Sequence, residues 1–223
     1  MKYYFLFGTL CSTTFIAMAS VEPQEIELKF KLSPQHSEKF KQSVAQKASQ
    51  PITMRETYFM GPELQPTQTN GYKKMKQYLR LRQTNKGSFI TLKKRSVNSL
   101  IEYETKIEDP IMMTRILQTL GYGTTETACV HFNKQRTKYN VTFENHQIEV
   151  VFDTFSEPVH MKEMGEFIET ELKSAAPSYK DGMAILKRFL LSQGITTIDV
   201  YPPYIELAIN QQYVDHIQHM TLN

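Results

Sequence analysis

The sequence predicts an α+β protein built as an antiparallel β-barrel with covering helices, and three observations support this prediction. Residues 25–30 alternate charged and apolar side chains, which is typical of a strand with one ionic face and one apolar face. Five later strand-like segments repeat the two-residue spacing of charges, and three other segments have the apolar spacing of amphipathic helices. The 223 residues fit one domain, because barrels of that size commonly do not divide.

Strands are predicted at several places along the chain. The hairpin between residues 76–84 and 88–95 turns at Asn85-Lys86-Gly87, where glycine can adopt the positive φ that the turn needs. Residues 61–71 contain Pro62 and Pro66 and are predicted as a long loop. The remaining predicted strands cover residues 25–30, 53–60, 100–108, 128–139, 147–154 and 164–173.

Three helices are predicted to cover the apolar outer faces of the strands. The first begins at Ser33, a favourable N-cap that is followed by proline. The second begins at Asp109-Pro110 and ends at Gly121, and the third runs from about residue 178 to 193. Their apolar stripes are Phe40, Val44 and Ala48 in the first, Ile111, Ile116, Leu117 and Leu120 in the second, and Met183, Leu186, Phe189 and Leu190 in the third.

The N-terminal residues 1–19 are typical of a signal peptide. A basic Lys2 precedes an apolar stretch, and Ala17-Met18-Ala19 matches a cleavage site. The main domain would then cover 20–210, with a frayed C-terminal tail at 211–223. An exported protein, periplasmic or secreted and without stable membrane association after cleavage, is expected on this interpretation. If residues 1–19 are instead an N-terminal strand or helix of the domain, the protein is cytoplasmic.

Composition and cysteine content exclude some kinds of site. The net charge of +3 and the 22% of charged residues are ordinary, so unusual electrostatics must come from where the charges lie. Cys11 lies within the signal-like segment, which leaves Cys129 as the single cysteine of the remaining chain. An intramolecular disulfide and a cysteine-based zinc site are therefore excluded after cleavage.

The ionic faces of the strands can point outward to water or inward to a lumen. The amphipathic helices favour the inward placement, because they can cover the apolar faces on the outside. Each isolated buried charge costs several kcal/mol, roughly, so a lumen rich in both signs needs ligands. A polyanion held by lysine and arginine, with divalent cations between it and the carboxylates, satisfies both signs, and oxygen ligands suit Mg²⁺ or Mn²⁺.

An ordered set of motifs over residues 24–207 resembles the CYTH family of triphosphate tunnel metalloenzymes. The resemblance implies an antiparallel eight-stranded β-tunnel that binds a triphosphate and a divalent metal. Family members include inorganic triphosphatases, thiamine triphosphatases and class IV adenylyl cyclases. The motifs are Glu25-x-Glu27-x-Lys29, Thr57-Tyr58-Phe59, Leu79-Arg80-Leu81-Arg82, Thr91-Leu92-Lys93, Glu102-Tyr103-Glu104, Lys134-x-Arg136, Asp153, and Gly165-x-Phe167-x-Glu169-x-Glu171.

The resemblance also implies roles for individual residues. Lys29 and Tyr58 are the expected catalytic residues: either this pair or a second metal would prepare the attacking water, and Tyr58 would orient the water or Lys29. The expected metal ligands are Glu25, Glu27, Asp153, Glu169 and Glu171, with Glu102 and Glu104 either binding metal or holding neighbouring bases in place. The expected triphosphate ligands are Lys29, Arg80, Arg82, Lys93 and Arg136, with Arg55, Arg95 and Lys134 as lesser candidates, whereas Lys138 is expected to be solvated.

The sequence departs from the family pattern at three points. Met60 stands where an aspartate commonly follows Tyr-Phe, and Pro202-Pro203 precede Tyr204 where a lysine is common. The chain also has no tryptophan, which weakens a thiamine triphosphatase interpretation because tryptophan best stacks on a thiazolium cation.

The resulting expectation is an Mg²⁺- or Mn²⁺-dependent hydrolase of inorganic triphosphate or a related small triphosphate. A class IV adenylyl cyclase and a thiamine triphosphatase are alternatives within the same fold. The alternative from another class is a non-catalytic module that binds polyphosphate or nucleotide. Nucleic acid is not expected as a partner, because bases inside a narrow tunnel cannot follow a duplex backbone. The oligomeric state is left open.

Overall fold

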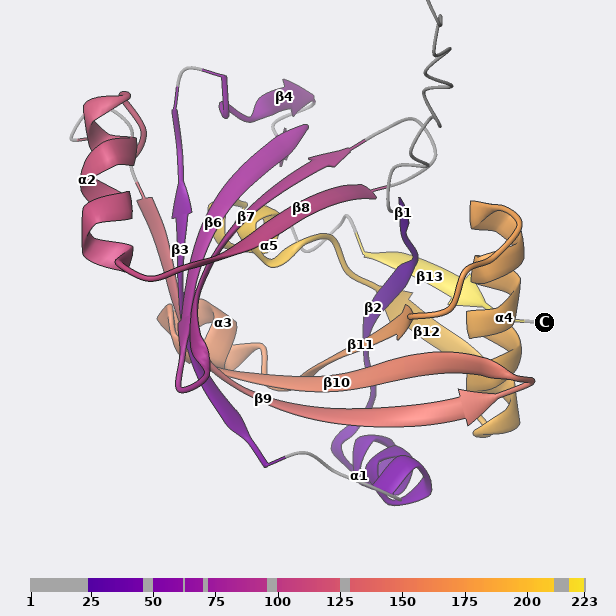
Figure 1. Ribbon diagram of the computed structural model, residues 1–223. Coiled ribbons are helices and arrows are strands. Elements are labelled where there is room, and N and C mark those ends of the chain that lie inside the picture. Colours follow the sequence, from indigo (N-terminus) through magenta and orange to yellow (C-terminus); the bar gives the residue numbers. More distant parts are fainter. Residues whose placement is uncertain are drawn as a thin grey trace, which may run out of the picture.

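The computed structural model describes residues 24–45, 50–61, 63–69, 72–95, 100–124, 129–210 and 217–222. The predicted signal peptide at 1–19 lies outside these residues. The predicted α+β class is confirmed, since helices surround one large antiparallel sheet (Figure 1). Within the described part of the chain, no helix is long and apolar enough to cross a membrane.

The large sheet contains eleven described strands, and every neighbouring pair is antiparallel. Their order is β1-β8-β7-β6-β3-β9-β10-β11-β2-β12-β13. The strands are β1 (Gln24–Glu25), β2 (Glu27–Lys31), β3 (Ile52–Phe59), β6 (Gln77–Thr84), β7 (Gly87–Arg95), β8 (Leu100–Ile107), β9 (Cys129–Phe143), β10 (His146–Glu157), β11 (Phe167–Leu172), β12 (Thr197–Val200) and β13 (Gln218–Thr221).

The first two strands bring distant parts of the curved sheet together. Only Ile26 separates β1 from β2, yet Glu25 lies opposite Leu100 of β8 and Glu27 lies opposite Glu171 of β11. The sheet is nevertheless not a strictly closed barrel, because β12 pairs with β2 and leaves only β1 to reach β8. The expected eight-stranded tunnel is thus a curved sheet with two extra strands beyond β2.

Among the described residues, five helices accompany the sheet: α1 (Pro34–Val44), α2 (Pro110–Thr119), α3 (Val159–Glu163), α4 (Tyr179–Ser192) and α5 (Tyr204–Ile209). The starts of the three predicted helices are confirmed. The side chains of Ser33, Asp109 and Ser178 each accept hydrogen bonds from backbone N–H groups of the first turn. The hairpin between β6 and β7 is also confirmed, and Gly87 has a φ of 135°.

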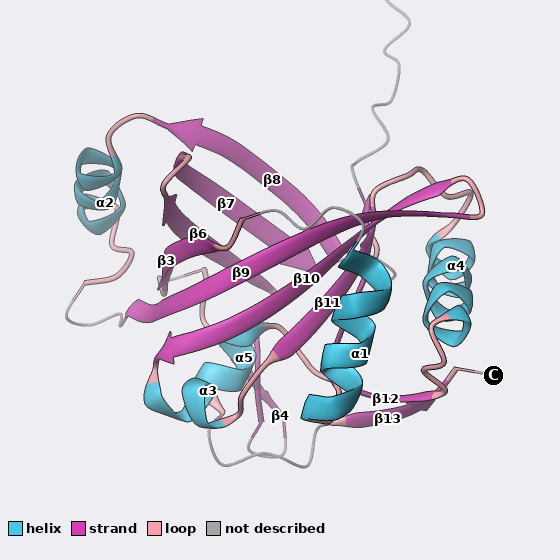
Figure 2. Ribbon diagram, turned by 90° about the horizontal axis from the view of Figure 1, so that it is seen from below, coloured by secondary structure: helices cyan, strands magenta, loops and turns pink. Residues whose placement is uncertain are grey.

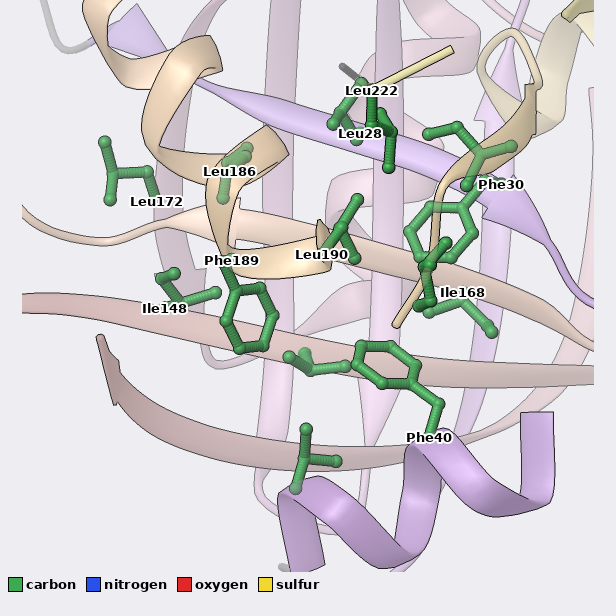
Figure 3. Packing of buried hydrophobic residues seen from close by; sticks show 14 of the residues in the cluster. Leu28, Phe30, Phe40, Ile148, Ile168, Leu172, Leu186, Phe189, Leu190 and Leu222 are labelled. Atoms are coloured by element: carbon green, nitrogen blue, oxygen red, sulfur yellow. The ribbon is translucent and has the colours of Figure 1, made fainter. Parts of the chain in front are cut away.

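The main hydrophobic core lies between the outer face of the sheet and the helices α1 and α4. Phe40 of α1 packs against Phe189 of α4, with ring centroids 6.2 Å apart, and against Phe152 of β10. Figure 3 shows these helices placing their apolar side chains onto Leu28 and Phe30 of β2. This packing covers the apolar strand faces and leaves the ionic faces pointing the other way.

The covering role predicted for the second helix is wrong. Leu117 of α2 is buried against Phe59 and Leu81, but Ile111 and Leu120 are 66% and 63% exposed. Figure 2 shows the reason: α2 lies beside one end of the sheet instead of across its face. The apolar stripe of α2 therefore contributes little to the core.

Two segments that were predicted as irregular contain strands. The predicted loop 61–71 includes β4 (Thr67–Thr69), which pairs with β5 (Tyr72–Lys74) in a small separate sheet. The predicted fraying of the C-terminal tail is wrong for its last part, because β13 pairs with β12 and Leu222 is only 2% exposed. Both corrections depend on pairing partners that local sequence does not reveal.

Candidate active site

The ionic faces of the strands point inward and surround a cavity of about 190 Å³. The inward placement is therefore confirmed. Most of the residues on the wall are charged, and both signs are present. The wall consists of Glu25, Glu27, Lys29, Tyr58, Tyr78, Arg80, Arg82, Lys93, Glu102, Glu104, Lys134, Arg136, Lys138, Glu149, Glu169, Glu171, Lys173, Pro203 and Tyr204.

On several strands the inner face is ionic along one part and aromatic along another. On β9, Phe132 precedes Lys134 by two residues, and on β11, Phe167 precedes Glu169 by two residues, so each pair lies on one face. These rings join Tyr58, Tyr78, Phe155 and Tyr204 in a second apolar cluster. The cavity is therefore bounded on one side by a packed aromatic layer, to which α5 contributes Tyr204.

Glu56 of β3 holds three of the bases on the wall. Its Oε1 lies 3.1 Å from Arg82 Nε and 3.3 Å from Arg80 Nη1, and its Oε2 lies 3.3 Å from Lys134 Nζ. Burial acts to raise the pKa of Glu56, but Lys134 and Arg80 lower it below its usual value. A carboxylate that stays ionised at this depth fixes the guanidinium groups that face the cavity.

Asp153, an expected metal ligand, lies behind the cavity wall. It is fully buried and does not line the cavity. Its Oδ1 accepts from Arg136 Nε at 2.7 Å, and its Oδ2 accepts from Lys134 Nζ at 3.2 Å and from the Tyr204 hydroxyl at 3.0 Å. In this arrangement Asp153 holds two bases of the wall in place from behind.

Lys29, Arg136 and Glu169 meet on the wall as expected. Glu169 lies 2.8 Å from Lys29 Nζ and 2.7 Å from Arg136 Nη2. Burial acts to lower the pKa of Lys29, but Glu169 and Glu27 raise it above its ordinary value. For Glu169 burial acts in the opposite direction, and Lys29 and Arg136 hold its pKa well below the usual range. All three groups are therefore charged at neutral pH.

A second group of charges gathers around Lys93 of β7. Lys93 Nζ lies 2.5 Å from Glu25 and 3.1 Å from Glu102. The side chain of Glu27 lies nearby and is 22% exposed. Burial and the neighbouring Glu27 raise the pKa of Glu25 to about 8, although Lys93 opposes this shift. The carboxylates therefore outnumber the cations at this part of the wall.

The outer part of the wall carries a third set of pairs. Glu171 lies 2.7 Å from Lys173, and Glu149 lies 2.9 Å from Lys138. Burial raises the pKa of Glu171, and Glu27 and Glu149 add to this effect. Lys138 was expected to be solvated, but it is only partly exposed and lines the cavity.

The remaining acidic candidates, Glu102 and Glu104, lie beside arginine. Arg80 Nη2 is 3.7 Å from each of them, and Arg82 is 3.5 Å from Glu104. Thr91 donates to Glu104 at 2.7 Å. In this state they match the second of their two expected roles, which is to hold neighbouring bases in place.

Tyr58 lines the cavity and is 3% exposed. Burial and the nearby Glu56 raise the pKa of its hydroxyl to about 12. Tyr58 therefore stays protonated at neutral pH and can donate a hydrogen bond, whereas it cannot serve as a base in that range.

Two predicted substrate ligands are not on the cavity wall. Arg55 is exposed on the outer face of β3, one residue away from the inward Glu56. Since successive residues of a strand face opposite sides, both cannot point inward. Arg95 also lies off the wall. Its Nη2 forms an ion pair with Glu206 of α5, at a distance of 3.1 Å.

Sequence reasoning missed several residues of the site. Glu56 and Tyr78 have the same parity as Tyr58 and Arg80 on their own strands, and this spacing alone places them on the inner face. Glu149 and Lys173 likewise flank predicted site residues. For Glu206, no comparable signal exists, because it meets its partners only through the folded position of α5.

The donor chemistry of the wall fits a hard divalent cation. Glu27 and Glu102 both act to raise the pKa of Glu25, and oxygen ligands are those that Mg²⁺ and Mn²⁺ prefer. Among the described residues, however, no three histidine, cysteine or acidic side chains are already gathered as a ligand set. Glu25, for example, is turned toward Lys93, so a cation would need that pair to separate.

Comparisons with known proteins agree with this geometry. Among solved structures, the PH1819 protein from Pyrococcus horikoshii OT3 is similar at 20% identity and a TM-score of 0.62, covering 84% of this chain and 99% of that chain. A putative adenylate cyclase from Bacillus halodurans has 14% identity and a TM-score of 0.53, covering 81% and 94%.

A third structure is the putative adenylyl cyclase HpAC1 from Hippeastrum, described as having a dominant triphosphatase activity. It has 17% identity and a TM-score of 0.53, covering 83% of this chain and 96% of that chain. Among curated proteins, no match was found. The CYTH domain family model matches residues 23–194, which is most of the chain. The protein is therefore a member of the CYTH domain family.

Proposed function

We propose that this protein is a metal-dependent triphosphatase that hydrolyses inorganic triphosphate or a related small triphosphate. The observation that carries the proposal is the composition of one cavity wall, where Lys29, Arg80, Arg82, Lys93 and Arg136 face carboxylates across a small space. The triphosphatase activity described for HpAC1 supports the same reaction class.

The bases are suited to hold a chain of phosphates. Arg80 and Arg82 are fixed by Glu56, and Arg136 is fixed by Asp153, so their guanidinium groups are oriented before substrate arrives. Arginine donates two parallel hydrogen bonds to phosphate oxygens, and each lysine adds a point charge. These contacts would neutralise the non-bridging oxygens as charge redistributes during phosphoryl transfer.

The carboxylates with the least protein compensation are the candidates to hold Mg²⁺ or Mn²⁺. We assign this role to Glu25, Glu27 and Glu171, with Glu169 and Glu102 as further oxygen donors. A bound divalent cation would supply Lewis-acid stabilisation of the phosphate and a more acidic water. Asp153 is left out of this set, because it is fully buried and does not line the cavity.

Lys29 and Tyr58 have distinct roles in the proposed reaction. Lys29 is charged and faces Glu169, so it would hold a phosphate oxygen or stabilise the leaving group. Tyr58 keeps its proton, so it would orient the attacking water by donating a hydrogen bond without removing a proton. The base that accepts the proton of water would then be a carboxylate of the wall.

A substrate screen tests the proposal. Purified protein is incubated with inorganic triphosphate, ATP and thiamine triphosphate in the presence of Mg²⁺ or Mn²⁺, and orthophosphate, pyrophosphate and cyclic AMP are quantified. Release of orthophosphate from a triphosphate supports the proposal. Cyclic AMP with pyrophosphate from ATP would identify a cyclase instead, and binding without turnover in either metal would identify a non-catalytic phosphate-binding module.

We also propose that the protein is exported, on the sequence of residues 1–19 alone. Expression of the full chain followed by N-terminal sequencing of the material outside the cytoplasm tests this. A mature chain that begins at Ser20 is the expected result, and an intact cytoplasmic chain would overturn it.

A further inference from the structure

The segment after the family match contributes a side chain to the cavity. The family model ends at residue 194, and α5 follows at Tyr204–Ile209. Tyr204 and Pro203 nevertheless line the cavity wall. Tyr204 is 4% exposed and packs edge-to-face on Phe155 and Phe167, with centroid distances of 4.8 and 5.4 Å. The aromatic layer therefore holds its ring in one orientation.

Two ammonium groups lie close to the ring of Tyr204. Lys29 Nζ is 4.1 Å from the ring centroid, and Lys134 Nζ is 4.8 Å from it. The hydroxyl group donates to Asp153 at 3.0 Å, and Asp153 in turn accepts from Lys134. A cation within about 6 Å of an aromatic face is attracted to it, and the attraction is larger in a site with little water.

The position of α5 is itself fixed by buried polar contacts. Glu206 accepts from the Met75 backbone N–H at 3.0 Å and from the Tyr72 hydroxyl at 3.1 Å, and it pairs with Arg95. Asn210 exchanges two hydrogen bonds of 2.7 Å with the backbone of Lys73. A segment anchored in this way can hold a side chain at a constant distance from β2.

We propose that Tyr204 is a positioning residue of the active site, whose ring keeps the ammonium group of Lys29 on the cavity wall, where it can reach a phosphate. This inference rests on the proposed function, because it assigns Tyr204 a part in triphosphate binding. Lys29 has three partners on the wall: the carboxylates of Glu169 and Glu27, and the ring of Tyr204. Because the ring is fixed by its own packing, it keeps Lys29 in position whether or not these carboxylates are engaged elsewhere.

The test measures binding of inorganic triphosphate to the metal-free protein by calorimetry, together with thermal unfolding. Tyr204→Leu should raise the dissociation constant by about tenfold, and Tyr204→Phe, which keeps the ring, by about twofold or less. Tyr201→Leu is the matched control, because Tyr201 lies on the same segment near Lys31 and is absent from the cavity wall. It should leave the dissociation constant unchanged.

A double-mutant cycle separates positioning from general packing. In a Lys29→Met background, Tyr204→Leu should change the affinity by about twofold or less, because the group on which the ring acts is gone. An equal loss in both backgrounds would overturn the proposal. If Tyr204→Leu does not fold, pentafluorophenylalanine is compared with phenylalanine at position 204, since fluorination keeps the shape and removes the attraction for cations. Weaker binding with the fluorinated ring supports the proposal, and equal binding overturns it.

The same measurements distinguish this inference from the proposed function. If the unaltered protein binds no triphosphate, the proposed function fails. If it binds triphosphate and the Tyr204→Leu protein binds equally well, only the role of Tyr204 fails.

Discussion

Arg136 of β9 and Asp153 of β10 are register partners on adjacent strands, and their side chains meet behind the cavity with Arg136 Nε 2.7 Å from Asp153 Oδ1. Asp153 is fully buried and also accepts from Lys134. It therefore balances two buried bases, and both of them line the cavity. This relationship predicts that Asp153 supports the bases of the site from behind.

Replacement of Asp153 should reduce stability more than it changes metal dependence. Asp153→Asn leaves Lys134 and Arg136 without a full counter-charge, which should lower the free energy of unfolding by about 3 kcal/mol. The metal concentration for half-maximal activity should stay the same. Asp199→Asn is the control, since Asp199 forms an exposed pair with His219 and should matter little. Denaturant unfolding and metal titrations measure both effects, and a large shift in metal dependence would restore Asp153 as a ligand.

Two arginines that lie close together in the sheet should differ sharply in their effect on triphosphate affinity. Arg82 lines the cavity, whereas Arg55 on neighbouring β3 is exposed on the outer face. Arg82→Ala should weaken the binding of inorganic triphosphate by about tenfold or more, because charge-assisted hydrogen bonds are lost. The Arg55→Ala protein should bind inorganic triphosphate with unchanged affinity. Similar losses in calorimetry for both variants would mean that the cavity is not the binding site.

The raised pKa of Glu25 predicts a pH dependence of stability in the metal-free protein. The folded carboxyl group keeps its proton up to about pH 8, while the unfolded one loses it near pH 4.5. The stability from this group is therefore present below pH 4.5 and is lost as the pH rises through about 8.

Glu25→Gln cannot lose that proton, so its melting temperature should rise relative to the unaltered protein across this range. Glu38→Gln, on the exposed surface of α1, is the control and should show no such trend. A constant difference between the Glu25 variant and the unaltered protein would contradict the assignment.

The C-terminal strand should be needed for stability. Leu222 is 2% exposed and belongs to the main core, and its backbone N–H donates to Thr196 at 3.0 Å. Leu222→Ala should lower the free energy of unfolding by about 2–4 kcal/mol through the cavity that it leaves. Thr221 is exposed, so Thr221→Ala is the control and should change the free energy of unfolding little. A chain truncated after residue 216 with full stability in urea would show that β13 is dispensable.

The sequence predicted the fold class and most of the site because both depend on local spacing. The period-two alternation that identifies a strand also identifies which side chains share a face, and helix caps at Ser33, Asp109 and Ser178 are local signals. Arg55 was wrongly predicted to bind substrate because the alternation of side chains along its strand was not taken into account. Tyr58 and Arg55 were both placed in the site, although an odd separation on one strand sends them to opposite faces.

Other features depend on contacts between distant residues, which spacing cannot reveal. Asp153 has the residue type and strand position of a metal ligand, but Tyr204, 51 residues later, occupies one of its oxygens. The strand β13 exists because β12 offers it an edge, and the helix α2 lies at the end of the sheet because of where β8 ends. Each of these outcomes is set by tertiary packing.

Hydrolysis of inorganic triphosphate, followed from about pH 5 to about pH 10 at scarce and at saturating Mg²⁺, shows whether the carboxylates of the cavity hold the catalytic metal. If the carboxylates of the cavity hold the metal as proposed, protons and Mg²⁺ compete for the same groups, among them Glu25. We therefore predict that a chelator abolishes orthophosphate release, and that saturating Mg²⁺ moves the acidic limb of the profile to lower pH. Turnover that persists in the chelator, or an acidic limb that stays at the same pH at both Mg²⁺ levels, would contradict a metal held by the carboxylates of this cavity.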